Sequence, residues 1–422
     1  MLLGAIADDL TGATDLSLML ARNGMKTVQY IGVPAPDADF GDAEAVVVAL
    51  KTRTVPAAEA IGAATGSATA LLNGGAEQIV FKYCSTFDST DAGNIGPVAE
   101  ALLEMTGAPI AIACPAFPAA GRSIYLGHLF VGQMLLSDSS MKDHPLTPMH
   151  DANLVRVLQR QSKGKVGLVP LRVVTEGPAA VREALAAAQK AGYRLMIADA
   201  VRDEDLRVLG EALADARLIT GGSGIGMGLP DNFRRRGRIG TTPLPSRMKA
   251  PQGKPVILAG SCSAATREQV RAAIVAGFPA LKIVPLDVAS GAQTAAQVAD
   301  WVMRNTSDRP TLVYSSDDPE AVKSVQDQLG RERAGTLIER LLAEVSVILK
   351  NTGFSRFIIA GGETSGAVVE ALGARALRIG PEIAPGVPWT RSIGAPDLAL
   401  ALKSGNFGGP DFFATALDLL DD

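Results

Sequence analysis

Two adjacent carboxylates end the first apolar segment of the chain. Residues Leu2–Ala7 are all apolar or small, and Asp8 and Asp9 follow them directly. An apolar run of this length predicts a buried strand, and a helix is expected to begin just beyond it. One aspartate could cap that helix, but capping does not require two. A carboxylate at this point could accept a proton from a substrate hydroxyl, so both are candidate catalytic residues, and the choice between them stays open.

Cations end two further apolar runs in the same half of the chain. Arg53 follows the run Ala45–Leu50, and Lys82 lies at the end of the run Gln78–Tyr83. If these runs are parallel strands of one sheet, their carboxyl ends meet at the edge where open α/β sheets bind ligands. Arginine offers a two-pronged fork to a carboxylate and lysine a point charge, so the pair could hold an anionic substrate. The alternative is that either cation only pairs with the two aspartates.

Glycine-rich turns follow apolar runs in the last third of the chain. Glycine lets the backbone approach a ligand closely, and the free N–H groups at the start of a following helix attract phosphate. Each turn alone is common in α/β proteins, but their joint presence favours a nucleotide site. There is no G-x-x-x-x-G-K-[ST] motif, so this is not a P-loop enzyme, and the run 221–228 does not fit G-x-G-x-x-G. The candidate nucleotide-site residues on these turns are Ser261, Ser263, Gly361, Gly362, Thr364 and Gly405.

The elements that would position these residues alternate along the chain. Short apolar runs are separated by alanine-rich helical stretches, the pattern of an α/β fold with mostly parallel sheets flanked by helices. The length of 422 residues is enough for two such domains. The segment 241–254 has three prolines and one glycine and no apolar periodicity, so it is interpreted as a linker between domains 1–240 and 255–422.

The expected boundaries can be stated for each element. The strands expected before the linker are Leu2–Ala7, Thr27–Ile31, Ala45–Leu50, Gln78–Tyr83, Ile110–Cys114, Leu195–Ala198 and Arg217–Thr220, with helices such as Ala13–Asn23 and Ala57–Leu72 between them. The strands expected after it are Pro255–Ala259, Ala280–Pro285, Thr311–Tyr314, Phe357–Ala360 and Ala376–Ile379.

Composition argues against several classes of protein. A net charge of −4 gives no electrostatic case for a nucleic-acid partner. No stretch approaches the roughly 18 apolar residues that a membrane helix needs, and the N-terminal apolar run is too short for a signal peptide. The three cysteines, Cys84, Cys114 and Cys262, are too few and too far apart for a disulfide framework or a zinc site, and no motif identifies metal ligands. A cytoplasmic protein is expected.

Five motifs taken together resemble the four-carbon acid sugar kinase family. They are ADDLTGATD at 7–15, KTRT at 51–54, KYCSTFDSTDAGNIGP at 82–97, CPAFPAAGRSIYLGHLFV at 114–131 and AGGETSGAV at 360–368. The 82–97 stretch is most similar to the 3-oxo-tetronate kinase branch, although Asp91 stands where that branch is expected to have proline. The resemblance covers nearly the whole chain and implies an N-terminal domain for the sugar acid and a C-terminal domain for ATP.

The resemblance also implies roles for individual residues. Ser85, Thr86 and Asp88 would join Arg53 and Lys82 in binding the sugar acid. Ser261, the turn Gly361–Thr364 with Glu363 in it, and Gly405 would contact ATP. Mg²⁺ is implied by the chemistry of ATP rather than by a ligand motif. The implied reaction is ATP-dependent phosphorylation of the terminal hydroxyl of 3-oxo-tetronate.

Two other functions share the same features and stay open at this point. An NAD-linked dehydrogenase of a sugar acid would use the same cations and glycine turns, and a non-catalytic sugar-acid-binding protein would need no ATP. The sequence also leaves open the preferred enantiomer and whether the chain forms a homo-oligomer.

Overall fold

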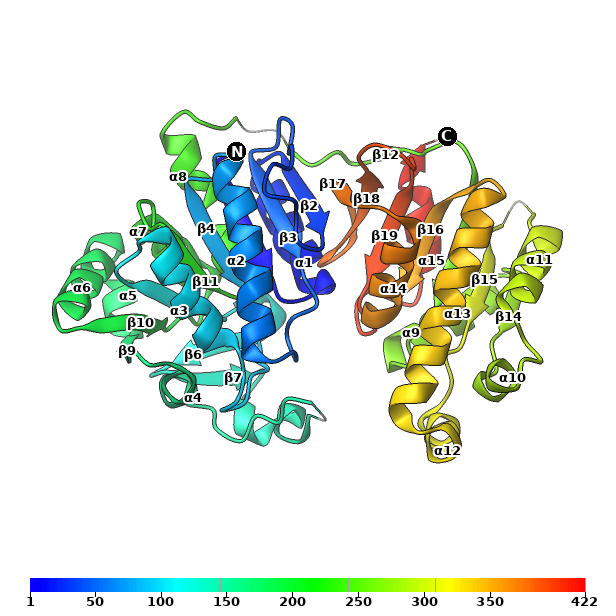
Figure 1. The fold of residues 1–422 in the computed structure, drawn as a ribbon, viewed down its shortest axis with the longest axis horizontal. Helices are drawn as coiled ribbons and strands as arrows, with labels where there is room; N and C mark the ends of the chain where they lie inside the picture. Colours follow the sequence, from blue (N-terminus) through cyan, green and yellow to red (C-terminus); the bar gives the residue numbers. More distant parts are fainter. Residues whose placement is uncertain (145, 241–242, 308, 422) are drawn as a thin grey trace. The chain divides into compact units, whose positions relative to one another are not determined.

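The structure is a computed structural model that describes residues 1–144, 146–240, 243–307 and 309–421. The chain forms two compact units, Met1–Pro243 and Leu244–Asp422 (Figure 1). Each unit has its own sheet with helices packed against it, and the two are described separately below. The expected α/β class with mostly parallel sheets flanked by helices is confirmed.

The sheet of the first unit runs in the order β2-β3-β1-β4-β11-β5-β10-β9, and each neighbouring pair is parallel. The strands are β1 (Leu3–Ala7), β2 (Thr27–Ile31), β3 (Ala45–Ala49), β4 (Gln78–Lys82), β5 (Ala111–Cys114), β9 (Lys165–Val169), β10 (Tyr193–Ala198) and β11 (Leu218–Gly221). The helices are α1 (Leu10–Arg22), α2 (Ala57–Asn73), α3 (Ile95–Thr106), α4 (Leu154–Gln161), α5 (Leu171–Thr175), α6 (Pro178–Lys190), α7 (Asp203–Ala212) and α8 (Pro230–Arg235). All residues of β1, β3 and β4 are buried, as expected for parallel strands covered on both faces.

The strand order of this unit reverses between β1 and β4. From β1 the chain passes through α1 to β2 and then to β3, which lies on one side of β1. From β3 it passes through α2 to β4, on the other side of β1. Right-handed crossovers in opposite directions place α1 and α2 on opposite faces of the sheet. The connections that follow β1 and β4 therefore run in opposite directions and leave a crevice between them. Ligands bind in such a crevice in open parallel sheets.

A small antiparallel sheet interrupts the parallel pattern of the first unit, and the sequence did not indicate it. Its strands are β6 (Arg122–Tyr125), β7 (His128–Val131) and β8 (Met134–Leu135). Asp199 ties it to the main sheet, since its carboxylate accepts hydrogen bonds from the backbone N–H groups of Leu126 (2.8 Å) and Gly127 (2.9 Å) in the turn between β6 and β7. Burial raises the pKa of Asp199, and these hydrogen bonds oppose that shift. Such strands are too short to show a clear alternation of apolar residues.

The sheet of the second unit runs in the order β14-β15-β13-β16-β19-β18-β17, parallel except at β18, which is antiparallel to both neighbours. Its strands are β13 (Lys254–Ala259), β14 (Ala280–Lys282), β15 (Thr311–Tyr314), β16 (Phe354–Ala360), β17 (Ala376–Ala384), β18 (Val387–Ser392) and β19 (Ala399–Lys403). Its helices are α9 (Ala264–Val275), α10 (Pro285–Ser290), α11 (Ala295–Asn305), α12 (Pro319–Leu329), α13 (Arg331–Asn351), α14 (Gly362–Leu372) and α15 (Phe412–Asp418).

The strand order of the second unit reverses between β13 and β16. The chain moves from β13 to β14 and β15 on one side and then through α12 and α13 to β16 on the other. The turns that follow β13 and β16 therefore flank a second crevice of the same kind as the one in the first unit. The core below it is formed by residues such as Ile257, Ile358 and Trp389, which are fully buried.

The segment 241–254, interpreted from its sequence as a linker, has some regular structure. Residues 241 and 242 lie outside the described residues. Further along, β12 (Met248–Lys249) pairs with β20 (Leu420–Asp421) near the end of the chain, and β13 already begins at Lys254. The second half of the segment is therefore part of the second unit rather than a free connection.

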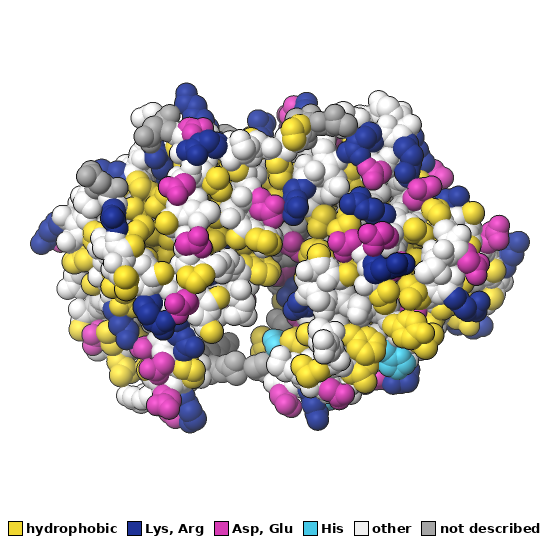
Figure 2. All heavy atoms as spheres, turned by 180° about the vertical axis from the view of Figure 1, so that it is seen from behind, with side chains coloured by type: hydrophobic (Ala, Val, Ile, Leu, Met, Phe, Trp, Pro, Cys, Tyr) yellow, Lys and Arg dark blue, Asp and Glu magenta, His cyan; other side chains and the backbone are white. Residues whose placement is uncertain are grey.

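Surface composition is mixed on the face that Figure 2 shows. Lysine and arginine side chains are interspersed there with aspartate and glutamate. Within the described part of the chain, no helix combines the length and the apolar character that crossing a bilayer would require.

Candidate active site

The loops after β1, β3 and β4 are joined by backbone hydrogen bonds at the crevice of the first unit. The N–H of Asp8 donates to the carbonyl of Lys82 (3.0 Å), and the N–H of Thr52 donates to the carbonyl of Asp8 (2.9 Å). Asn94 secures the third loop, because its side-chain amide donates to the carbonyls of Thr52 (2.7 Å) and Val55 (3.1 Å). These contacts place the predicted charged residues of three strands within reach of one another.

Arg53 stands at the centre of a buried group of charges. Its Nε and Nη2 donate to the two carboxylate oxygens of Asp8, each at 2.9 Å. Nη2 also lies 2.7 Å from Oδ1 of Asp9, and Nη1 lies 3.7 Å from Oδ2 of Asp88. Arg53 thus pairs with both aspartates, and its role in binding a substrate stays a prediction. Pairing with Asp8 holds the guanidinium in one orientation and leaves its Nη1 as the less occupied donor.

The two adjacent aspartates have different local roles. Asp9 is the N-cap of α1, and its Oδ1 accepts a hydrogen bond from the N–H of Gly12 at 3.0 Å. The Nζ of Lys82 lies 3.8 Å from the same oxygen. The Asp9 side chain is 29% exposed, whereas that of Asp8 is 5% exposed and both its oxygens are taken by Arg53. Asp9 is therefore the carboxylate of the pair that a substrate can reach.

The pKa values of the two aspartates are shifted in opposite directions. Burial raises the pKa of Asp8, and the Arg53 guanidinium only partly opposes it. Burial acts in the same direction on Asp9, but Arg53 and Lys82 together outweigh it, so the pKa of Asp9 is lowered. For Arg53, burial is outweighed by the two aspartates, and its pKa is raised. Asp9 is accordingly a carboxylate that stays ionised beside two cations.

The loop after β4 carries the remaining predicted residues of this site. Thr86 donates a hydrogen bond to Oδ1 of Asp88 (2.6 Å), and both side chains are buried. Phe87 and Asp88 have positive φ values of 65° and 39°, a conformation that costs energy for residues other than glycine and often marks a functional site. Phe87 packs edge-on against Tyr83 with ring centroids 5.5 Å apart, which holds the strained turn in place. Ser85 lies in the same loop and is half-buried.

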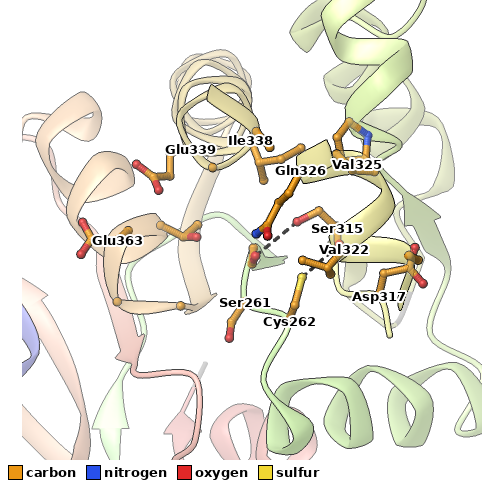
Figure 3. A pocket seen from close by; sticks show the side chains of 18 residues that line it. Ser261, Cys262, Ser315, Asp317, Val322, Val325, Gln326, Ile338, Glu339 and Glu363 are labelled. Carbon is orange, nitrogen blue, oxygen red and sulfur yellow. Dashed lines mark hydrogen bonds between the residues drawn. The ribbon is translucent and has the colours of Figure 1, made fainter. Parts of the chain in front are cut away.

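The crevice of the second unit contains a pocket of about 410 Å³ (Figure 3). The turn after β13 contributes Ser261 and Cys262, and the turn after β16 contributes Gly361–Thr364. Most of the residues predicted for a nucleotide site are thus brought together, although a hundred residues of sequence separate the two turns. The thiol of Cys262 donates to the carbonyl of Ser315 (3.7 Å), which holds the turn after β13 against the loop after β15.

Close backbone contacts explain the glycines of this pocket. A Cβ at Gly260 would collide with the hydroxyl of Thr364, and Gly361 has a φ of +134°, which other residues rarely adopt. Helix α14 begins directly after Gly361, and among the described residues no side chain caps it. Its first N–H groups therefore lie at the pocket without a side-chain partner, which is the arrangement that binds phosphate at helix N-termini.

Ser263 and Gly405 lie beside this pocket rather than in its lining. Ser263 is the N-cap of α9, and its hydroxyl also donates to the carbonyl of Gly405 at 2.6 Å. A Cβ at Gly405 would collide with the hydroxyl of Ser261, so the two turns touch there. The hydroxyl of Ser263 is thus committed to holding the turns together, and of these two serines only Ser261 is part of the pocket lining.

Helices α12 and α13 form a wall of the pocket that was not foreseen from the sequence. Figure 3 shows Val322, Val325 and Gln326 of α12 and Ile338 of α13 opposite Ser261. The apolar side chains of Val322, Val325 and Ile338 suit the flat, apolar face of a nucleotide base. One local signal could have revealed α12, since Asp318 caps a helix whose first residue is a proline.

The glycines of 221–228 allow close packing within the first unit. A Cβ at Gly221, Gly222 or Gly224 would collide with the backbone carbonyls of residues 114–116. Gly228 lies equally close to Gly210 on α7. This run is a close contact between segments of the first unit.

Comparison with known proteins agrees with the two sites. A family model described as a sugar-binding N-terminal domain matches residues 3–229, and one described as a nucleotide-binding C-terminal domain matches residues 256–413. The chain is 56% identical to the 3-oxo-tetronate kinase of Cupriavidus necator, over 99% of this chain and 96% of that protein. It is 53% identical to the 3-oxo-tetronate kinase of Burkholderia multivorans, over 100% and 97%. A crystal structure of a Haemophilus influenzae protein shares 42% identity and superposes with a TM-score of 0.84, covering 99% of each chain.

Proposed function

The chain belongs to the four-carbon acid sugar kinase family, and from this membership we propose that it transfers the γ-phosphate of ATP to the terminal hydroxyl of 3-oxo-tetronate. The products are the 4-phosphate of the sugar acid and ADP. A metabolic kinase of this type works where ATP is made and used, so a cytoplasmic location follows from the same proposal.

The observation that carries this proposal is the presence of two different crevices, each at the point where a strand order reverses. The one after β1 and β4 contains acidic and basic side chains, and the start of α1 beside them is capped by Asp9. The one after β13 and β16 has an uncapped helix start, close glycine turns and an apolar wall. The first is suited to a small hydroxy acid and the second to a nucleotide, so we assign the sugar acid to the first unit and ATP to the second.

Asp9 is proposed to orient and deprotonate the reacting hydroxyl. The hydroxyl oxygen attacks the γ-phosphorus, the bond from that phosphorus to the β,γ-bridging oxygen breaks, and the hydroxyl proton passes to a carboxylate oxygen of Asp9. A strong base is not needed, because phosphoryl transfer passes through a loose transition state in which positioning dominates. The lowered pKa of Asp9 is therefore compatible with the role, and its exposure lets the hydroxyl approach. Asp8 is proposed to act through Arg53, whose orientation it holds.

Arg53 and Lys82 are proposed to hold the carboxylate of the sugar acid. The Nη1 of Arg53 makes the longest of that side chain's ion-pair contacts, at 3.7 Å, and the ammonium of Lys82 lies 3.8 Å from Asp9. Both can strengthen their contacts to an incoming carboxylate without a change of fold. Ser85, Thr86 and Asp88 on the strained loop are proposed to bind the remaining hydroxyl and carbonyl oxygens.

ATP is proposed to bind with its phosphates at the start of α14, in contact with Ser261, Gly361, Gly362, Thr364 and the neighbouring Gly405. The base would lie against the apolar wall of α12 and α13. Mg²⁺ commonly keeps several waters and needs only one or two carboxylates besides the phosphates. Within the described part of the chain no cluster of three or more metal-binding side chains exists, but the exposed carboxylate of Glu363 lines the pocket and suits this limited role. When bound, the ion would neutralise phosphate charge.

The test is a direct measurement of both products. The full-length protein is incubated with ATP, Mg²⁺ and each member of a panel of four-carbon acids, and ADP and sugar phosphate are quantified by mass spectrometry. We expect ADP and one equivalent of a 4-phosphate with 3-oxo-tetronate, and much less with threonate or erythronate. Reduction of NAD by a tetronate without ADP would instead identify a dehydrogenase, and binding without any turnover would identify a sugar-acid-binding protein.

A further inference from the structure

A buried lysine lies behind the nucleotide pocket and has no part in the proposed function so far. Lys403 is the last residue of β19, and it is fully buried. Its Nζ donates to the carbonyls of Ser404 and Gly405, each at 2.9 Å, and to the hydroxyl of Thr266 at 3.1 Å. The ring of Phe412 lies beneath the ammonium, with its centroid 5.9 Å away. All three hydrogen-bond donors of the ammonium are therefore used.

The surroundings of this cation are electrostatically unfavourable. In the described part of the chain no carboxylate forms an ion pair with it, and burial alone lowers the pKa of Lys403 to about 8. Thr266 lies in the first turn of α9, so the positive charge lies close to a helix N-terminus, where the helix dipole favours an anion. A buried, unpaired cation is costly unless something negative binds nearby.

The position of Gly405 connects this cation with the pocket. The carbonyl oxygen of Gly405 accepts hydrogen bonds from Lys403, from the hydroxyl of Ser263 (2.6 Å) and from that of Thr266 (2.8 Å). These donors draw the carbonyl toward α9, and Gly405 then touches Ser261 on the side of the pocket. Lys403 thus helps to fix the turn at Gly405 and places a positive charge directly behind that turn.

We infer that Lys403 is a positioning residue for ATP, whose buried charge is balanced by the ATP phosphates and whose hydrogen bonds hold Gly405 against Ser261. The inference rests on the proposed kinase function. It adds a cation to a phosphate site that otherwise consists of backbone N–H groups and hydroxyls. It also explains how a lysine can be kept inside the second unit without an acidic partner.

Other charged groups near β19 do not supply the missing counter-charge. On α9, Glu268 is exposed and paired with Arg271, and the guanidinium of Arg267 donates to the carbonyl of Asp317. On α15, Asp411 and Asp418 are exposed, as are Glu363 and Glu370 on α14. Arg356 on β16 donates to a backbone carbonyl, and Arg391 on β18 pairs with Asp397. The phosphates of ATP are thus the anion that this geometry leaves for Lys403.

The first experiment separates binding of ATP from binding of the sugar acid. Lys403→Met keeps the length of the side chain without its charge, and we expect it to raise KM and Kd for ATP by about 10-fold or more. KM for 3-oxo-tetronate is expected to stay within about twofold. Thr266→Val removes the hydroxyl that bonds both Gly405 and the ammonium but leaves the charge and its bonds to the two carbonyls, so it should have a clearly smaller effect on Kd. Circular dichroism and thermal melting check that each variant is folded.

The second experiment uses the charge itself and begins with the unmodified protein. Binding of ATP with Mg²⁺ is measured by calorimetry on the full-length protein from about pH 7.5 upward, where the phosphates are already fully ionised. Because the pKa of Lys403 is about 8 without ATP and an anion raises it, binding should take up a proton and weaken as the pH rises. Lys403→Arg stays charged throughout, so its affinity should not fall over this range.

Each result has a distinct meaning. Wild-type affinity of Lys403→Met for ATP, or a wild-type affinity that does not change with pH, would overturn the inference while leaving the kinase activity intact. A loss of stability with unchanged ATP affinity would show that the lysine has only a structural role. If the wild-type protein binds ATP but forms no ADP with any four-carbon acid, the proposed function fails and the inference about Lys403 does not.

Discussion

At the carboxyl end of the first strand, the neighbouring residues Asp8 and Asp9 lie in different environments. Asp8 is buried and held by both prongs of Arg53, whereas Asp9 caps α1 and remains partly exposed. Successive residues at the end of a strand point in opposite directions, so only one of the two can be directed toward the start of the helix. Because the surroundings differ, substitutions at the two positions should be distinguishable.

We predict that Asp9→Asn lowers kcat by roughly 10²- to 10⁴-fold with little change in melting temperature. Asparagine caps a helix nearly as well as aspartate, so the start of α1 is preserved and only the proton acceptor is lost. Steady-state kinetics and differential scanning calorimetry test this. Asp8→Asn is the comparison, and it should mainly raise KM for the sugar acid because Arg53 loses its partner. Loss of kcat in Asp8→Asn with normal kcat in Asp9→Asn would reverse the assignment.

Arg53 and Lys82 are predicted to determine the affinity for the sugar acid and not for ATP. A charge-assisted hydrogen bond contributes about 1.5–3 kcal/mol, so Arg53→Lys and Lys82→Met should each raise KM for 3-oxo-tetronate by about 10- to 150-fold. Arg53→Lys keeps the charge but cannot form the fork with Asp8, so any effect isolates the geometry of the guanidinium. KM is measured with each substrate varied in turn. An increase confined to ATP would show that these cations bind phosphate.

At the scale of elements, the Lys82 side chain from the end of β4 lies directly against Gly12 in the first turn of α1. A Cβ at Gly12 would collide with the Nζ of Lys82 and with Oδ1 of Asp9. We predict that Gly12→Ala raises KM for the sugar acid about 10-fold by displacing Lys82. Gly62, exposed in the middle of α2 with nothing within 4 Å of a Cβ, is the matched control. Gly62→Ala should stabilise the protein by about 0.5–1 kcal/mol without affecting kinetics. If the two variants have the same KM for the sugar acid, Gly12 does not position Lys82.

Helix α4 is attached to the loop after β4 by an ion network that makes stability dependent on pH. Asp151 accepts hydrogen bonds from Arg156 (2.7 Å) and Arg160 (3.2 Å), and Arg160 also pairs with Asp91 at 2.6 Å. Hydrogen bonds from Arg156 lower the pKa of Asp151 to about 2, below its ordinary value of 3.8. The stabilisation is therefore complete above about pH 4 and is lost as the pH falls toward 2.

The prediction for this network is a change in melting temperature that depends on pH. Asp151→Asn should lower the melting temperature of the protein by about 1–3 °C at neutral pH, as for a partly exposed ion network. The difference from the wild type should shrink between about pH 4 and pH 2. Calorimetry over this range tests it, with Asp37→Asn, an exposed aspartate, as the control. A difference that does not change with pH would mean that the network does not act through the charge of Asp151.

At the scale of the whole molecule, the two substrates are assigned to different units of the chain. Hydrogen–deuterium exchange on the full-length protein tests this division without separating the units. ATP should slow exchange in the turns 260–263 and 361–364, and the sugar acid should slow exchange in 8–12 and 82–88. The antiparallel sheet at 122–135 is expected to be unaffected by either ligand. Protection of 8–12 by ATP, with none in the second unit, would reverse the assignment.

Much of the α/β framework was predictable because its signal is local. The strands Thr27–Ile31 and Thr311–Tyr314 agree with the structure residue for residue, and most other predicted strands differ by a few residues at an end. Strand β9 of the first unit was not predicted. In the second unit β18 and β19 were not predicted, and β17 is longer than expected. In this part of the chain β18 pairs antiparallel with β17 and β19, its neighbours in sequence, so no helix separates these strands and the strand–helix alternation used for the prediction is missing.

The residue types at the strand ends were also visible in the sequence, since Asp8, Asp9, Arg53 and Lys82 each end or follow an apolar run. Parallel strands bring such ends to one edge, so their proximity could be foreseen from the fold class alone. Their roles in binding and catalysis stay predictions. What the sequence determined about this protein is therefore the framework and the chemistry available at its edges.

Only the tertiary structure decided how those groups pair. The fork of Arg53 on Asp8, the apolar wall from α12 and α13, and the burial of Lys403 against Thr266 all join residues from separate elements. Periodicity and turn chemistry report on a few neighbouring residues, whereas these contacts depend on the packing of helices against the sheet. Burial and hydrogen-bond partners arise from that packing, and they decide which of several similar charged groups is left free to meet a ligand.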